Sequence, residues 1–129
     1  MIVVDCSALF AFLTSPAEHP QVAEILQSSS GIAAPDFLDV EFAHALRKCE
    51  RLGRIDAARA NMALSDMMSL RVERFPSSDL LLGIWEMRHN FSAYDAAYAV
   101  LAQHLNAPLL TVDMRFKRAA VEHFKIVLL

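Results

Sequence analysis

The sequence predicts an α/β domain built around a mainly parallel sheet. A short, fully apolar run of β-branched residues lies at residues 2–4, and a second run typical of a buried strand lies at residues 109–112. Between them lie longer segments whose apolar residues have helical spacing. Only three glycines occur in 129 residues, so little of the chain is left for loops. Strands that alternate with helices in this way are typical of parallel sheets covered by helices.

The first part of the chain begins with a strand at residues 2–4, because an unbroken apolar run indicates a strand covered on both faces. Residues 7–13 and 18–27 have helical character. The SSSG sequence at 28–31 is a turn signal, and residues 32–34 are expected to form the next strand.

A third helix is expected over residues 37–53, with Gly53 at its end. Its apolar residues fall on one helical face, at Leu38, Phe42, Ala45, Leu46, Cys49 and Leu52.

The second half repeats the alternation. The elements expected there are a helix over 56–70, a strand over 71–75, helices over 78–90 and 92–105, a strand over 109–112, a helix over 115–122 and a strand over 125–129.

Composition sets limits on the protein class. A chain of 129 residues with 55% hydrophobic residues suits one globular domain, residues 1–129. Its net charge of −3 argues against non-specific coating of nucleic acid, but not against a local grip on a few phosphates. The apolar start lacks a basic leader region and is too short to span a bilayer, so a cytoplasmic protein that does not enter the membrane is expected. Cys6 and Cys49 are expected to be reduced core thiols.

Asp5 and Asp113 each follow an expected strand directly. Ligands of parallel sheets bind beyond the carboxyl ends of the strands, so these acids face the same edge if their strands are neighbours. Each acid alone also fits a helix N-cap. The repeated pattern favours a site.

Two further acids are candidates. Asp95 lies in the first turn of an apolar helix, where SAYD at 92–95 fits a capping box, a role compatible with a site. Glu41 and Asp39 lie at opposite edges of the apolar stripe of the third helix, and the pattern does not choose between them.

A convergence of Asp5, Glu41, Asp95 and Asp113 would be electrostatically costly. Two like charges about 5 Å apart repel by roughly 3 kcal/mol at an effective dielectric constant near 20. Retained protons or a bound cation would relieve this repulsion. Oxygen ligands without thiolate or imidazole favour hard ions such as Mg²⁺ or Mn²⁺, which serve phosphate chemistry.

The chain resembles the PIN domains, and among them the VapC toxins of bacterial toxin–antitoxin pairs. The resemblance covers nearly the whole length, and it depends on four segments in order: MIVVDCSALFAFL, APDFLDVEFAHALRK, FSAYDAAYAVLAQHLNAPLLTVD and DMRFKRAA. It implies a parallel five-stranded sheet between helices and a Mg²⁺- or Mn²⁺-dependent endoribonuclease that hydrolyses RNA phosphodiester bonds.

The resemblance also implies roles for individual residues. The catalytic and metal-binding acids would be Asp5, Glu41, Asp95 and Asp113, which selects Glu41 over Asp39. Ser7, Thr111 and Arg115 would be supporting residues near the same site. Implied partners are RNA, a cognate antitoxin whose C-terminal segment wraps the toxin, and a second copy of the chain in a homodimer.

Some features stay open. Basic residues on the third helix fit either contacts to RNA phosphates or an acidic partner, or a solvated face: Arg47, Lys48, Arg51 and Arg54. A methionine-rich segment fits a peptide groove, core packing or dimer packing: Met62, Met67 and Met68. Three aromatics fit a partner contact or the core: Trp85, Tyr94 and Tyr98.

Two other functions remain as alternatives to the ribonuclease. One is a non-catalytic α/β interaction module of PIN-like fold, in which the acids are helix caps and surface groups. The other is a phosphatase or related phosphoryl-transfer enzyme, although the chain lacks an Asp-x-Asp pair after the first strand.

Overall fold

The computed structural model describes residues 1–123 and contains a parallel sheet of four strands within them. Their order across the sheet is β3-β2-β1-β4, and their bounds are β1 Ile2–Val4, β2 Ile32–Pro35, β3 Val72–Phe75 and β4 Leu109–Leu110. The prediction of a parallel α/β architecture is therefore confirmed. The fifth strand, expected over residues 125–129, lies outside the described residues.

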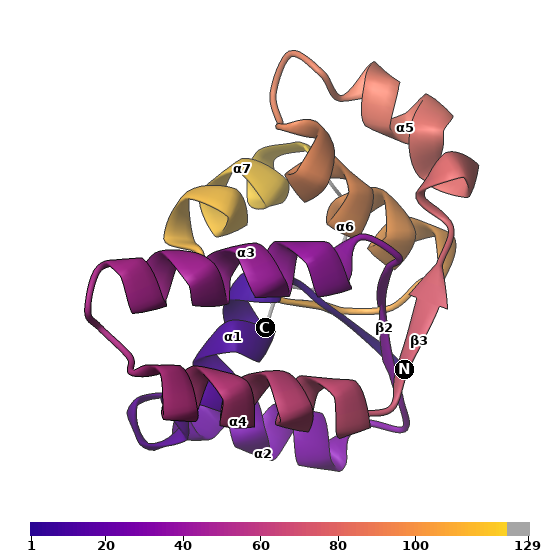
Figure 1. Ribbon diagram of the computed structural model, residues 1–129. Helices are drawn as coiled ribbons and strands as arrows, with labels where there is room; N and C mark the ends of the chain where they lie inside the picture. Colours follow the sequence, from indigo (N-terminus) through magenta and orange to yellow (C-terminus); the bar gives the residue numbers. More distant parts are fainter. Residues whose placement is uncertain (124–129) are drawn as a thin grey trace.

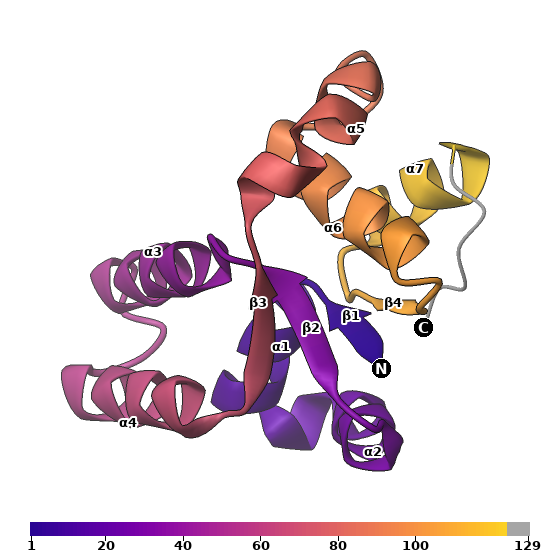
Figure 2. The ribbon, with the colours of Figure 1, turned by 90° about the vertical axis from the view of Figure 1, so that its right-hand side faces the viewer.

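The helices pack on both sides of this sheet. Their bounds are α1 Cys6–Thr14, α2 Pro20–Ser28, α3 Leu38–Arg51, α4 Ala57–Ser69, α5 Leu81–Glu86, α6 Ala93–His104 and α7 Met114–His123, with short 3₁₀ turns η1 Pro16–Glu18 and η2 Ser77–Leu80. Figure 2 shows α3 and α4 on one side of the sheet and α6 and α7 on the other. The short α5 lies outside this arrangement, beyond α6, at the top of Figures 1 and 2.

Two predicted elements differ from the structure. The helix expected over 78–90 is split into η2 and α5, and a turn follows Glu86. The strand expected over 109–112 ends at Leu110. It ends there because the next backbone amides leave the sheet: the amide of Val112 donates to Ser7 Oγ, and that of Asp113 to Thr111 Oγ1.

One part of the core lies where the central strands meet α6, and the same cluster includes buried residues of α1 and α3. Val3, Val4 and Ala33 have no exposed surface, and neither do Ala96 and Ala97 of α6. The small alanine side chains let α6 lie close to the sheet. Its apolar residues are therefore buried against the strands. Among residues 1–123, no helix combines the length and apolar character needed to cross a bilayer.

The residues left open by the sequence are divided between core and surface. Met67 is buried, whereas Met62 and Met68 are exposed, so the methionines do not form one buried cluster. Tyr98 is buried, but Trp85 and Tyr94 are exposed. Cys6 and Cys49 are both free, as predicted, but each is half-buried and not fully enclosed in the core.

Candidate active site

Asp5 follows β1 and caps α1. Its Oδ1 accepts hydrogen bonds from the Ala8 amide at 3.0 Å and from the Ser7 hydroxyl at 2.7 Å. The residue is nevertheless buried, with only 5% of its surface exposed. The cap explains why α1 begins here, but a cap needs no burial. Because burial of a carboxylate is costly, the capping of α1 does not by itself explain why Asp5 is buried.

β4 lies beside β1 and brings a second set of oxygens to Asp5. Val4 pairs with Leu110, and the Asp5 amide donates to the Leu110 carbonyl at 3.1 Å. Thr111, the next residue, donates its hydroxyl to Asp5 Oδ2 at 2.7 Å. The Ser7 and Thr111 hydroxyl oxygens lie 3.3 Å apart. The small hydroxyl residues singled out in the sequence thus lie against the Asp5 carboxylate.

Thr111→Val is expected to destabilise the protein by about 1–3 kcal/mol, because it leaves a buried carboxylate oxygen without its donor. Thr111→Ser, which keeps the hydroxyl, serves as the matched control. Urea unfolding followed by circular dichroism measures both. A Thr111→Val protein as stable as the serine variant would show that this hydrogen bond contributes nothing.

Asp113 lies at the start of α7 on the same edge of the sheet. Its Oδ1 accepts from the amides of Arg115, at 2.9 Å, and Phe116, at 3.1 Å. Arg115 therefore contributes its backbone to the hydrogen bonds of Asp113, and its side chain is exposed. Unlike Asp5, Asp113 is exposed to solvent, so its charge costs little.

Asp95 occupies the first turn of α6. The Ser92 hydroxyl accepts from its amide at 3.1 Å, which is one half of the predicted capping box. The backbone amide of Asp95 thus takes part in the helix cap. The pKa of Asp95 is raised to about 6, first by burial and then by the charges of Asp113 and Asp5.

Glu41 is held by a contact that the sequence did not predict. The hydroxyl of Tyr98, on α6, donates to Glu41 Oε1, on α3, at 2.6 Å. Tyr98 follows Asp95 by three residues, which places both on one face of α6, and this spacing is the signal that could have identified it. Asp39 is engaged elsewhere, in a two-pronged ion pair with Arg74 at 2.7 and 2.8 Å.

The four predicted acids interact electrostatically. Burial raises the pKa of Asp5, and the charge of Asp113 adds to this effect. Burial also raises the pKa of Glu41, and the charges of Asp5 and Asp95 raise it further. These mutual effects show that the acids share one region beyond the carboxyl ends of β1 and β4.

No basic side chain balances this group among residues 1–123. Their salt bridges join Arg74 to Asp39 and His123 to Glu122, neither of which involves the four acids. Within the same residues, no three His, Cys, Asp or Glu side chains are close enough together to form a complete metal site. The donors are thus suited to a hard cation in their chemistry, but any such ion would need water among its ligands.

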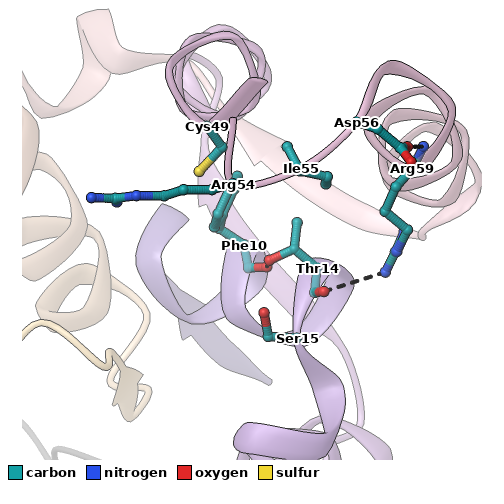
Figure 3. A pocket seen from close by; sticks show the side chains of 8 residues that line it. All are labelled: Phe10, Thr14, Ser15, Cys49, Arg54, Ile55, Asp56 and Arg59. Carbon is teal, nitrogen blue, oxygen red and sulfur yellow. Dashed lines mark hydrogen bonds between the residues drawn. The ribbon is translucent and has the colours of Figure 1, made fainter. Parts of the chain in front are cut away.

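A separate hollow lies between α1, α3 and α4, away from the acids (Figure 3). It contains Arg59, whose guanidinium donates to the carbonyls of Leu13 at 2.7 Å and Thr14 at 3.5 Å. The arginine ties α4 to the end of α1, where the last carbonyls of a helix lack partners. The hydrogen bonds of Arg59 in this hollow thus have a structural role, which is to join two helices.

Comparison with known proteins agrees with this architecture. The PIN domain family model matches residues 2–122. A VapC ribonuclease of Mycobacterium bovis is 40% identical over 115 residues, which is 89% of this chain and 87% of that protein. Ribonuclease VapC1 of Mycobacterium tuberculosis is 37% identical over 118 residues, 91% of this chain and 89% of that protein.

Solved structures share the fold. The structure of PAE2754 from Pyrobaculum aerophilum superimposes with a TM-score of 0.69 at 27% identity, covering 98% of this chain and 86% of that one. VapC20 of Mycobacterium tuberculosis, a toxin that cleaves the sarcin-ricin loop, has a TM-score of 0.67 at 21% identity, with 92% and 95% of the two chains covered. The chain therefore belongs to the PIN domain family and, within it, to the VapC toxins.

Proposed function

We propose that this protein is a toxin endoribonuclease that hydrolyses RNA phosphodiester bonds with the help of Mg²⁺ or Mn²⁺. The observation that carries the proposal is a group of four carboxylates, each of which interacts electrostatically with at least two of the others, without a basic partner among the described residues. Relatives named as ribonucleases, at 37–40% identity over most of their length, support the reaction class.

Asp5, Asp95 and Asp113 are the residues proposed to hold the cation, directly or through water. Mg²⁺ commonly binds one or two carboxylates and retains several waters, so a complete cage of three protein ligands is not required. When bound, the cation neutralises phosphate charge and provides an acidified water. Ser7 and Thr111 fix the orientation of Asp5 through their hydroxyls.

Glu41 is proposed to ligate the cation or to orient the water that attacks phosphorus. Its hydrogen bond from Tyr98 fixes the carboxylate, and burial raises its pKa, which makes it a stronger base. Tyr98 is a positioning residue in this scheme, because it acts through Glu41.

The partners proposed for the chain are RNA as substrate, a cognate antitoxin and a second copy of the toxin. A structural relative, VapBC2 from Rickettsia felis, was solved bound to a DNA fragment from its promoter, with a TM-score of 0.67 at 19% identity. This relative supports the proposal of a paired antitoxin.

The test is cleavage of total cellular RNA by the purified toxin with Mg²⁺, with Mn²⁺ and with EDTA. Cleavage is expected with either cation and not with EDTA. If the protein cuts no RNA and neither ion changes its melting temperature, the interaction-module alternative is correct. Turnover of a phosphomonoester without RNA cleavage would instead identify a phosphatase.

A further inference from the structure

Two hollows adjoin on the exposed side of α3 and share His44. The first is lined mainly by apolar groups and includes one of the four acids: Phe37, Val40, Glu41, His44 and Tyr94. The second is basic: His44, Arg47, Lys48, Arg51 and Leu52. All these positions on α3 recur at intervals of three and four residues, so they form one strip along the helix. From Glu41 to Arg51 the strip extends about 15 Å.

The aromatic end of the strip is connected to the acids. Tyr94 is 58% exposed, and its ring packs edge-on against Phe37, with centroids 5.4 Å apart. Phe37 also packs against Tyr98 at 5.7 Å. Since Tyr98 donates to Glu41, this exposed aromatic surface is fixed next to the proposed catalytic centre.

The basic end carries charges that form no salt bridge with any other residue in the described range, 1–123. Arg47, Lys48 and Arg51 are exposed. Neither of the salt bridges found in residues 1–123 involves them. Their charges are therefore available to an anionic ligand that extends along α3 in the direction away from the acids.

We propose that this strip along α3, together with Tyr94 of α6, binds the single-stranded RNA substrate: one base stacks on the exposed ring of Tyr94, which Phe37 holds edge-on, and Arg47, Lys48 and Arg51 hold the phosphates that follow. Proteins that bind single strands combine basic grooves with aromatic side chains that stack on bases. An acidic peptide would also match the basic end, but single-stranded RNA carries a planar base on every charged unit and so matches both ends at once. The inference depends on the proposed ribonuclease function.

Binding is measured by fluorescence anisotropy with a labelled single-stranded RNA. The Asp95→Asn protein in EDTA is the common background, so binding is read without cleavage. Adding Tyr94→Ala is expected to weaken binding about tenfold, and Tyr94→Phe to preserve it, because stacking needs the ring and not the hydroxyl. The ring should matter much less for an RNA whose nucleotides all lack bases.

The basic end is tested by salt dependence. For single strands, each lost phosphate contact makes the negative slope of log K against log salt concentration shallower by about 0.7, so the Arg47→Ala/Arg51→Ala double variant should make it shallower by about 1.4. Tyr94→Ala should leave the slope unchanged. Arg71→Ala is the matched control, because Arg71 is exposed, precedes β3 and lines neither hollow.

Three results would overturn the inference. Tyr94→Ala could bind RNA like Tyr94→Phe, the double variant could keep the parental salt slope, or Tyr94→Ala could convert a dimer to a monomer in sedimentation. The last result would make the strip an interface between copies. Absence of cleavage by the unmodified toxin would instead contradict the proposed function, and the binding assay separates the two failures.

Discussion

Replacing Asp95 by asparagine is expected to lower the rate of RNA cleavage by about 10²–10³-fold, a loss typical of removing one group that stabilises charge at a reaction centre. Asparagine keeps the size of the side chain and the amide that donates to Ser92. The fold should therefore persist, and the loss should appear in kcat as well as in cation binding.

The same substitution is expected to stabilise the cation-free protein at pH 7. The pKa of Asp95 is raised to about 6 in the folded state from an ordinary value of 3.8. Its contribution to stability is therefore fully present below pH 4 and is lost as the pH rises towards 6. After allowance for solvent screening, removal of the charge should gain about 1 kcal/mol, or about 4 °C in melting temperature.

Cleavage assays and thermal unfolding in EDTA test both halves of this prediction. Asp79→Asn is the matched control, because Asp79 also lies at the start of a helical turn but is not among the groups that shift the pKa values of the four acids. Its activity and stability should remain near those of the parent. An Asp95→Asn protein that cleaves RNA at the parental rate would remove Asp95 from the site.

The sequence predicted the fold and most of the candidate site because both depend on local patterns. Four of the expected strands were placed correctly, and the two acids after β1 and β4 were expected to meet if those strands were neighbours. The pairing of Val4 with Leu110 fulfils that condition. Helical breaks were harder to predict: the residues around Leu80 have helical character throughout, yet η2 precedes α5.

Contacts between distant segments explain what the sequence could not decide. The helical pattern left Glu41 and Asp39 equivalent, and the resemblance alone separated them. In the structure, Arg74 of β3 engages Asp39, whereas Tyr98 of α6 holds Glu41. Arg74 lies 35 residues from Asp39 and Tyr98 lies 57 from Glu41, so no local pattern carries this information.

Cation binding is expected to stabilise the protein more at pH 7.5 than at pH 4.5. The pKa values of Asp5, Glu41 and Asp95 are all raised, chiefly by burial. Folding therefore favours their protonated forms, and the stability that these forms contribute is lost as the pH rises through the folded-state pKa values. For Asp95 this loss occurs between about pH 4 and pH 6. At pH 7.5 Asp95, whose pKa is about 6, is charged and is repelled by its neighbours, so a cation has more repulsion to relieve than at pH 4.5.

Thermal unfolding in Mg²⁺ and in EDTA at the two pH values measures this effect. A cation at 100 times its Kd adds about 2.7 kcal/mol, which for a domain of this size corresponds to a rise of about 10 °C. The gain should be small at pH 4.5 and nearly absent in Asp95→Asn at either pH. KCl at equal ionic strength is the control for general screening of charge. If KCl reproduced the Mg²⁺ effect, the acids would be responding to ionic strength, and the proposal of a specific cation site would fail.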